Sequence, residues 1–153
     1  MHENDYAHCD LKMPNILLDE NLTAKITDFG ITKNLKFGLT NKTVLAGFSE
    51  RICSYEYLVE QKSKNKIRIV STKGDIWSFG ILIYELLSGK LAWSGLSGPQ
   101  TVIIVSMKTA FFSYNKKAGN EYFDRVIERC LNYDYKERPT AHALLTEFKE
   151  FLN

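Results

Sequence analysis

The chain has 153 residues, which is enough for one domain with a buried core. It is 44% hydrophobic and 25% charged, and its net charge of +2 is too small to indicate nucleic acid or a membrane surface as a partner. Its 3 cysteines include no C-x-x-C pair, which speaks against a zinc site or a disulfide framework and predicts a reducing, cytoplasmic setting. No secretory signal opens the chain, and the longest apolar run, 76–87, is too short to cross a bilayer.

The first third of the chain predicts short strands and loops. Three brief β-prone runs, Tyr6–His8, Asn15–Leu18 and Ala24–Thr27, are separated by turn-forming residues. From about Ile31 to Val44 there is no clean hydrophobic period, so we predict a loop. The lysine-rich stretch from Lys62 to Lys73 predicts a solvated surface loop.

The second half is helical in character. Asp75 is placed to cap a helix that runs to about Ser88, and Gly89 is placed to end it. This helix is apolar nearly all round, and a helix without a polar face is normally buried on every side. We therefore expect it to be the central helix of the domain.

Two amphipathic helices are predicted further on. The first carries apolar residues at helical spacing over 122–131, and the second follows Pro139 with Thr140 as its cap. The apolar face of the second is expected to comprise Ala141, Leu144, Leu145, Phe148, Phe151 and Leu152. Between the central helix and these two, Thr101–Met107 is ambiguous, because its run of Val and Ile favours a strand.

The residues that can carry chemistry lie at 8–15 and 28–30. Phosphoryl transfer needs a carboxylate to orient and deprotonate the attacking hydroxyl, together with cations and their ligands to hold the phosphates. Asp10 can be that carboxylate, and Lys12, two residues on in an extended loop, points to the same side. Asn15 and Asp28 are oxygen donors of the type that Mg²⁺ prefers. Taken singly, each would be an ordinary loop or turn residue.

Taken together, these segments resemble the protein kinase family. The pattern H-x-D-L-K-x-x-N at 8–15 and the D-F-G triplet at 28–30 occur in the family's order and spacing. Residues 54–56 stand where the family has A-P-E, 75–80 resemble the start of its central helix, and 138–140 resemble its R-P-T. Five matches in register cover essentially the whole chain.

The resemblance implies a fold and a domain organisation. We expect a mainly α fold, the C-terminal lobe of a protein kinase: a helical subdomain around a buried central helix, with a few short β-strands carrying the catalytic and metal-binding loops. Residues 1–153 would form a partial kinase domain without the N-terminal lobe. The catalytic loop would be 8–15, the activation segment 28–56 and the central helix about 75–88.

The resemblance also implies roles for single residues. Asp10 is similar to the family's catalytic base, and Lys12 to the residue that steadies the transferring phosphate. Asn15 and Asp28 resemble the two metal ligands, and Leu17 the apolar floor under the adenine ring. ATP and Mg²⁺ (or Mn²⁺) would be the cofactors. The lysine in D-L-K is the serine/threonine-type form, which implies protein substrates with Ser or Thr hydroxyls.

Other matched residues would support the site. His8 and Phe29 resemble a packed pair that fixes the two loops against each other, which makes His8 a structural histidine rather than an acid or base. Gly30 would supply unusual backbone angles after Asp28. Asp75 is similar to the aspartate that holds the backbone amides of the catalytic loop. One more pair, Glu56 and Arg138, resembles the family's buried ion pair.

The activation segment departs from the family's pattern. Cys9 replaces the arginine that usually binds a phosphate there, so we expect phosphorylation of Thr40 or Thr43 to change activity little. Ser49 keeps a hydroxyl where the family has a substrate-positioning threonine. Tyr55 replaces the usual proline, a change in the part of the segment expected to determine peptide specificity.

The 153 residues contain no G-x-G-x-x-G loop and no V-A-I-K lysine. We therefore expect them by themselves to turn over no peptide and to bind ATP weakly. Three interpretations stay open: a piece of an active Ser/Thr kinase, a non-catalytic kinase-like binding module, and the relic of a degenerating gene. The intact residues Asp10, Lys12, Asn15 and Asp28 favour the first.

Overall fold

The computed structural model describes residues 1–36, 49–60 and 70–153, and within them the fold is mainly helical, which confirms the predicted fold class. The α-helices are α1 (Tyr55–Glu60), α2 (Thr72–Ser88), α3 (Gly98–Ser106), α4 (Phe111–Tyr114), α5 (Glu121–Cys130) and α6 (Ala141–Leu152). The strands are β1 (Tyr6–Ala7), β2 (Ile16–Leu18), β3 (Ala24–Ile26) and β4 (Lys33–Asn34). Short 3-10 helices are η1 (His2–Asn4), η2 (Met13–Asn15), η3 (Glu50–Ile52) and η4 (Tyr135–Glu137).

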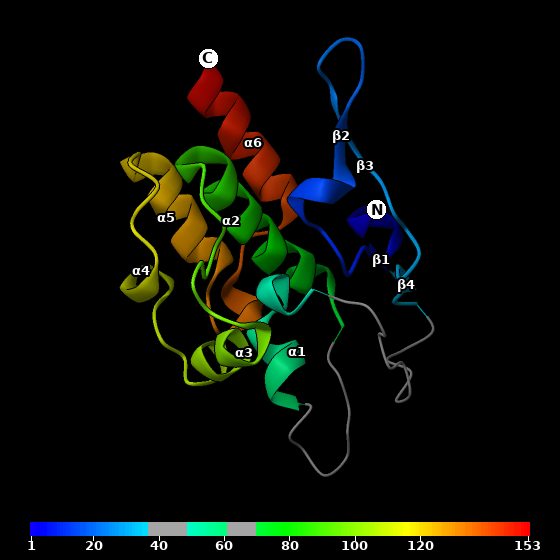
Figure 1. The fold of residues 1–153 in the computed structure, drawn as a ribbon. Coiled ribbons are helices and arrows are strands. Elements are labelled where there is room, and N and C mark those ends of the chain that lie inside the picture. The colour runs from blue at the N-terminus through cyan, green and yellow to red at the C-terminus, as the bar shows by residue number, and fades with distance from the viewer. Residues whose placement is uncertain (37–48, 61–69) are drawn as a thin grey trace.

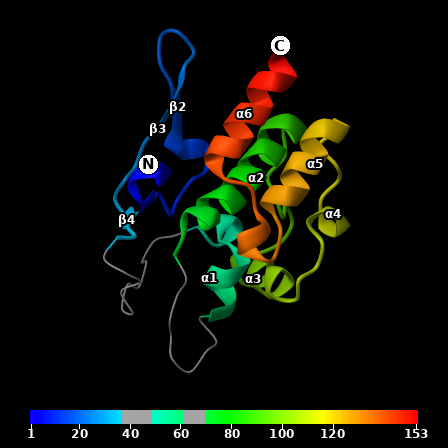
Figure 2. The same ribbon diagram turned by 180° about the vertical axis from the view of Figure 1, so that it is seen from behind.

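Helix α2 is the centre of the molecule, with the strands on one side of it and α5 on the other in both views (Figures 1 and 2). Its end is as predicted, because Gly89 takes the left-handed conformation with φ 64° and donates its N–H to the carbonyl of Glu85. Its start is earlier than predicted. Ser71 occupies the N-cap position, and Asp75 lies inside the first turn, so the expected capping role of Asp75 is wrong.

Close packing of α2 against α5 depends on Gly80. A Cβ at this position would lie 2.7 Å from the Cβ of Cys130, so only glycine lets the two helices approach this closely. The expected burial on every side holds for most of α2 but not for its last turn, where Leu86 and Leu87 are 62% and 40% exposed. No neighbouring element of the described chain covers that turn.

The ambiguous stretch Thr101–Met107 is helical: Thr101 to Ser106 belong to α3, and Met107 is its C-cap. Ser97 starts this helix with a reciprocal capping box, in which its hydroxyl accepts from the N–H of Gln100 and its own N–H donates to the Gln100 side chain. Pro99 stands in the first turn, where proline is tolerated. The helix buries Thr101 and Val105, so capping and packing override the β-propensity of this run.

Helices α5 and α6 lie where the periodicity predicts them. The Thr140 hydroxyl caps α6 by accepting from the N–H of Ala143 at 3.1 Å, as expected. The predicted apolar face of α6 is only partly buried: Leu144 is 2% exposed, whereas Leu145 and Phe151 are about half exposed. Leu145 lines an open groove of about 700 Å³ that α6, α2 and the N-terminal turn border. Across the described residues, each helix is either too short or too polar to cross a membrane.

The strands form two small antiparallel sheets that position the loops of the site. Strand β1 pairs with β4, which lies in the stretch predicted to be loop, so that prediction is wrong for Lys33 and Asn34. Strands β2 and β3 form a hairpin that extends away from the helices (Figure 1), with Ile16 opposite Ile26. This register places the residue before β2, Asn15, beside the residue after β3, Thr27.

Candidate functional site

The carboxylate of Asp10 lies at the centre of the candidate site. Asp10 is 5% exposed, and its Oδ2 lies 2.7 Å from Nζ of Lys12 and 3.1 Å from Nδ2 of Asn15. Its Oδ1 is buried and has no hydrogen-bond partner among the described residues. A buried carboxylate oxygen without a protein donor is uncommon in folded proteins.

Asn15 completes the catalytic loop from within η2. Its Nδ2 also donates to the backbone carbonyl of Asp10 at 2.8 Å, so both amide hydrogens are directed at Asp10. The Oδ1 of Asn15 is left as an acceptor. The hairpin register brings the other predicted oxygen donor nearby, because the backbone carbonyl of Asn15 accepts from the N–H of Thr27, one residue before Asp28, at 2.9 Å.

Asp28 follows β3 with an exposed side chain and a positive φ of 62°. Its Oδ1 accepts from the N–H of Gly30 at 3.3 Å, and a Cβ at Gly30 would lie 3.2 Å from that oxygen. The residue with a positive φ is thus Asp28, and the φ of Gly30 is not positive. The expected reason for Gly30 is corrected: it leaves room for the Asp28 carboxylate rather than supplying an unusual backbone angle.

His8 ties the catalytic loop to the segment around Asp28. Its Nε2 lies 2.9 Å from the carbonyl of Thr27, and its Nδ1 accepts from the N–H of Asp10 at 3.3 Å. Both bonds hold at once only in the neutral tautomer with the proton on Nε2. The His8 ring meets the ring of Phe29 edge-on with centroids 5.3 Å apart. The structure thus brings together the pair that the sequence placed against each other.

Asp75 connects this loop to the central helix. Its Oδ2 accepts from the N–H of His8 at 2.7 Å and its Oδ1 from the N–H of Cys9 at 2.8 Å. Nε2 of His2 lies 2.8 Å from the same carboxylate. The predicted contact with the loop amides is present, whereas His2 is a partner that the sequence analysis missed, since no local pattern marks a contact across 73 residues.

Cys9 stands next to Asp10 but is a poor nucleophile. Burial, together with the negative charge of Asp75, raises the pKa of the Cys9 thiol to about 12. At neutral pH the group is therefore a thiol rather than a thiolate, and only the thiolate is reactive.

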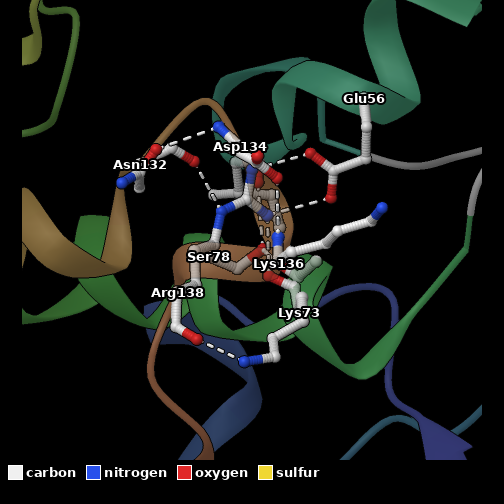
Figure 3. Close-up of polar contacts among 9 residues, drawn as sticks. Glu56, Lys73, Ser78, Asn132, Asp134, Lys136 and Arg138 are labelled. Atoms are coloured by element: carbon white, nitrogen blue, oxygen red, sulfur yellow. Dashed lines mark hydrogen bonds and ion pairs between the residues drawn. The ribbon is translucent and has the colours of Figure 1, made fainter.

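The predicted ion pair between Glu56 and Arg138 is present and buried (Figure 3). Nη1 of Arg138 donates to Oε1 of Glu56 at 2.9 Å and Nη2 to Oε2 at 2.7 Å. The guanidinium also donates to the carbonyls of Asn132 and Lys73, each at 2.8 Å, and lies over the ring of Trp77. Lys73 in turn donates its Nζ to the carbonyl of Arg138. This cluster joins α1, α2 and the segment before α6.

The other predicted residues are spread more widely. Leu17 lies on β2 with 54% of its surface exposed, beyond the catalytic loop. Ser49 directly precedes η3, and its carbonyl accepts from the N–H of Ile52 and the Sγ of Cys53. Thr40 and Thr43 lie outside the described residues. No sequence pattern marks Arg51 of η3, which reaches three carbonyls more than 40 residues away.

Comparisons with known proteins agree with this geometry. A family model described as "Protein kinase domain" matches residues 1–148. The chain is 34% identical to 3-phosphoinositide-dependent protein kinase B of Dictyostelium discoideum over 94% of this chain and 15% of that protein. It is 31% identical to the serine/threonine-protein kinase TOUSLED of Arabidopsis thaliana, covering 86% of this chain and 20% of that protein.

A third relative is the tyrosine-protein kinase FRK of Homo sapiens, which is 28% identical over 99% of this chain and 29% of its own length. The chain thus spans between 15% and 29% of the length of these three relatives.

Proposed function

This chain belongs to the protein kinase domain family, and on that premise we propose that it carries the catalytic and metal-binding loops for phosphoryl transfer from ATP to Ser or Thr hydroxyls of proteins. The observation that carries the proposal is the state of Asp10. One of its oxygens is held by Lys12 and Asn15, and the other is buried and has no donor in the described part of the chain. The hydroxyl of an incoming substrate would donate a hydrogen bond to that oxygen.

The residues present suit a magnesium ion. Asn15 offers an amide oxygen and Asp28 a carboxylate, which are the donors that Mg²⁺ prefers. The described residues contain no cluster of three His, Cys, Asp or Glu side chains that could form an all-protein cage. This is the donor set of an ion that keeps waters and binds substrate phosphates. When bound, the ion would neutralise charge on the phosphates.

The chain's own residues would do the remaining work. Asp10 would orient the substrate hydroxyl through Oδ1 and take up its proton as the new phosphate ester forms. Lys12, with its ammonium 2.7 Å from Asp10, would place a positive charge beside the transferring group. Leu17 would offer the adenine ring an apolar surface. His8, Phe29 and Asp75 would act through the backbone by holding the two loops together.

The substrate class and location are parts of the same proposal. Lys12 in D-L-K supports Ser and Thr acceptors. Of the three relatives, one is named as a serine/threonine-protein kinase and another as a tyrosine-protein kinase. The 3 cysteines, with no C-x-x-C pair, support an intracellular location.

Incubating the full-length protein with Mg²⁺, labelled ATP and a mixed-peptide library tests the proposal. We expect label on Ser and Thr, loss of at least about a hundred-fold in rate for Asp10→Asn, and retained ATP binding in that variant. The matched control is Asp134→Asn, an exposed carboxylate that caps η4. Equal activity of Asp10→Asn and the control would contradict the role of Asp10, and label on Tyr alone would contradict the substrate class.

A further inference from the structure

The guanidinium of Arg51 forms three hydrogen bonds, an anchor for η3, that take no part in the proposed phosphoryl transfer. Arg51 lies in η3, and its guanidinium donates from Nη1 to the carbonyls of Ala92 at 3.2 Å and Trp93 at 3.4 Å, and from Nη2 to that of Leu96 at 2.9 Å. All three acceptors belong to the connection between α2 and α3. A planar guanidinium presents several N–H groups in a fixed fork, so one side chain fixes three backbone groups at once.

The connection that Arg51 binds is itself firmly held. Ala92 and Trp93 are 0% and 2% exposed. Their N–H groups donate to the side chains of Glu85 at 2.9 Å and Asn115 at 3.0 Å. Burial raises the pKa of Glu85, and the charge of Arg51 acts in the opposite direction. Arg51 therefore rests on a rigid support rather than on a loose loop.

The other residues of η3 are fixed as well. The hydroxyl of Ser78 on α2 donates to the carbonyl of Ile52 at 2.9 Å. Gly98, at the start of α3, leaves the space in which the Glu50 carboxylate lies, because a Cβ there would be 1.6 Å from Oε2. A three-residue helix buries little, so such contacts decide where it sits.

Segment 49–53, which contains η3, lies beside the catalytic loop. A cavity of about 40 Å³ is lined by Cys9 of that loop, by Ile52 and Cys53 of the segment, and by Asp75 of α2. Any displacement of η3 therefore moves the surface next to Asp10, while the bonds of Asp10, Asn15 and Asp28 involve none of these residues.

We propose that Arg51 is a positioning residue for the protein substrate: its three bonds to the α2–α3 connection fix segment 49–53, and with it Ser49, at the place where the acceptor peptide meets Asp10. This inference rests on the proposed function and names the part of the site that serves the peptide rather than ATP. Because the fork geometry matters, lysine, which keeps the charge but not the fork, is expected to fail as well.

The test compares Arg51→Met and Arg51→Lys in the full-length protein with Arg125→Met, which alters an exposed arginine of α5. We expect the KM for a peptide substrate to rise about ten-fold in both Arg51 variants, while the KM for ATP and the slow hydrolysis of ATP by water stay within about two-fold. An equal loss of ATP hydrolysis, or an unchanged peptide KM in Arg51→Lys, would overturn the proposal.

Thiol labelling tests the same anchor without relying on activity. The Sγ of Cys53 donates to the carbonyl of Ser49, so loosening of η3 should expose it. We expect iodoacetamide to label Cys53 several-fold faster in Arg51→Met than in Arg125→Met, with buried Cys130 as the internal standard for global unfolding. Equal rates would refute the anchor. Absence of both phosphorylation and ATP hydrolysis in the unaltered protein would instead refute the proposed function.

Discussion

Replacing Glu56 with glutamine should cost this chain much of its stability. The two side chains of the Glu56–Arg138 pair are 6% and 0% exposed, so neither can regain water when the other changes. Glutamine keeps the size of glutamate and one acceptor oxygen, but its NH₂ group would face the guanidinium, which has only donors. Arg138 would then keep a buried charge with no counter-ion.

The size of the effect follows from that burial. Removing one partner of a buried, hydrogen-bonded ion pair costs about 3–5 kcal/mol. The remaining bonds of Arg138, to the carbonyls of Asn132 and Lys73, hold the guanidinium in place and prevent it from turning to solvent. For a chain of this size each kcal/mol lowers Tm by about 2–4 °C, so Glu56→Gln should lower it by about 6–20 °C.

Urea and thermal unfolding followed by circular dichroism measure this loss. The matched control is Glu147→Gln, which also removes a charge facing an arginine, Arg129 at 2.6 Å, but in a pair whose side chains are 31% and 48% exposed. An exposed pair of this kind contributes less than about 1 kcal/mol. An equally small loss of unfolding free energy in both variants would refute the role given to burial.

Three further predictions follow from the packing and the sequence. Gly80→Ala should lower the free energy of unfolding in a urea titration by about 1–3 kcal/mol, because the new Cβ meets α5. Gly74→Ala in the same helix should not lower it, because the nearest atom to its Cβ lies at 3.6 Å. Burial raises the pKa of Cys130 to about 12, so the native thiol stays protonated over about pH 8 to 10. Its alkylation, measured by mass spectrometry, should therefore be only as fast as the unfolding of the chain. A phosphate on Thr40 or Thr43 should change the kinase rate less than several-fold, and larger activation of the phosphorylated protein would contradict this.

The proximity of Asp10, Lys12 and Asn15 could be predicted from the sequence because the three residues are local. Asp10, Lys12 and Asn15 lie within six residues of one another, so a short extended segment brings them together whatever surrounds it. Asp28 was paired with Asn15 only through the family resemblance. The hairpin that brings the two to the same end was not predicted from the sequence.

Contacts across the fold were predicted only where a family motif marks both partners, as for Glu56 and Arg138. Arg51 reaches carbonyls 41 to 45 residues away, and any arginine in a polar stretch looks the same in sequence. Backbone angles were equally hidden, which is why the positive φ was expected near Gly30 although it falls on Asp28. The extent of burial of the predicted apolar face of α6 was hidden too, because a hydrophobic period indicates a face but not how much of it a neighbour covers. Leu145 on that face is 52% exposed.

Polar groups of the central helix hold three segments around the site, in addition to the packing of its apolar surface. Asp75 holds the amides of the catalytic loop, and Ser78, one turn on, holds the carbonyl of η3. The carbonyl of Lys73 at its first turn accepts from Arg138, which in turn holds Glu56 of α1. Residues within two turns of α2 therefore hold three segments that are distant in sequence, namely the catalytic loop, η3 and α1. Loss of Glu56 should therefore act on stability. Loss of the Arg51 side chain, which bonds to the α2–α3 connection rather than to α2, should act on the peptide substrate while the catalytic loop stays in place.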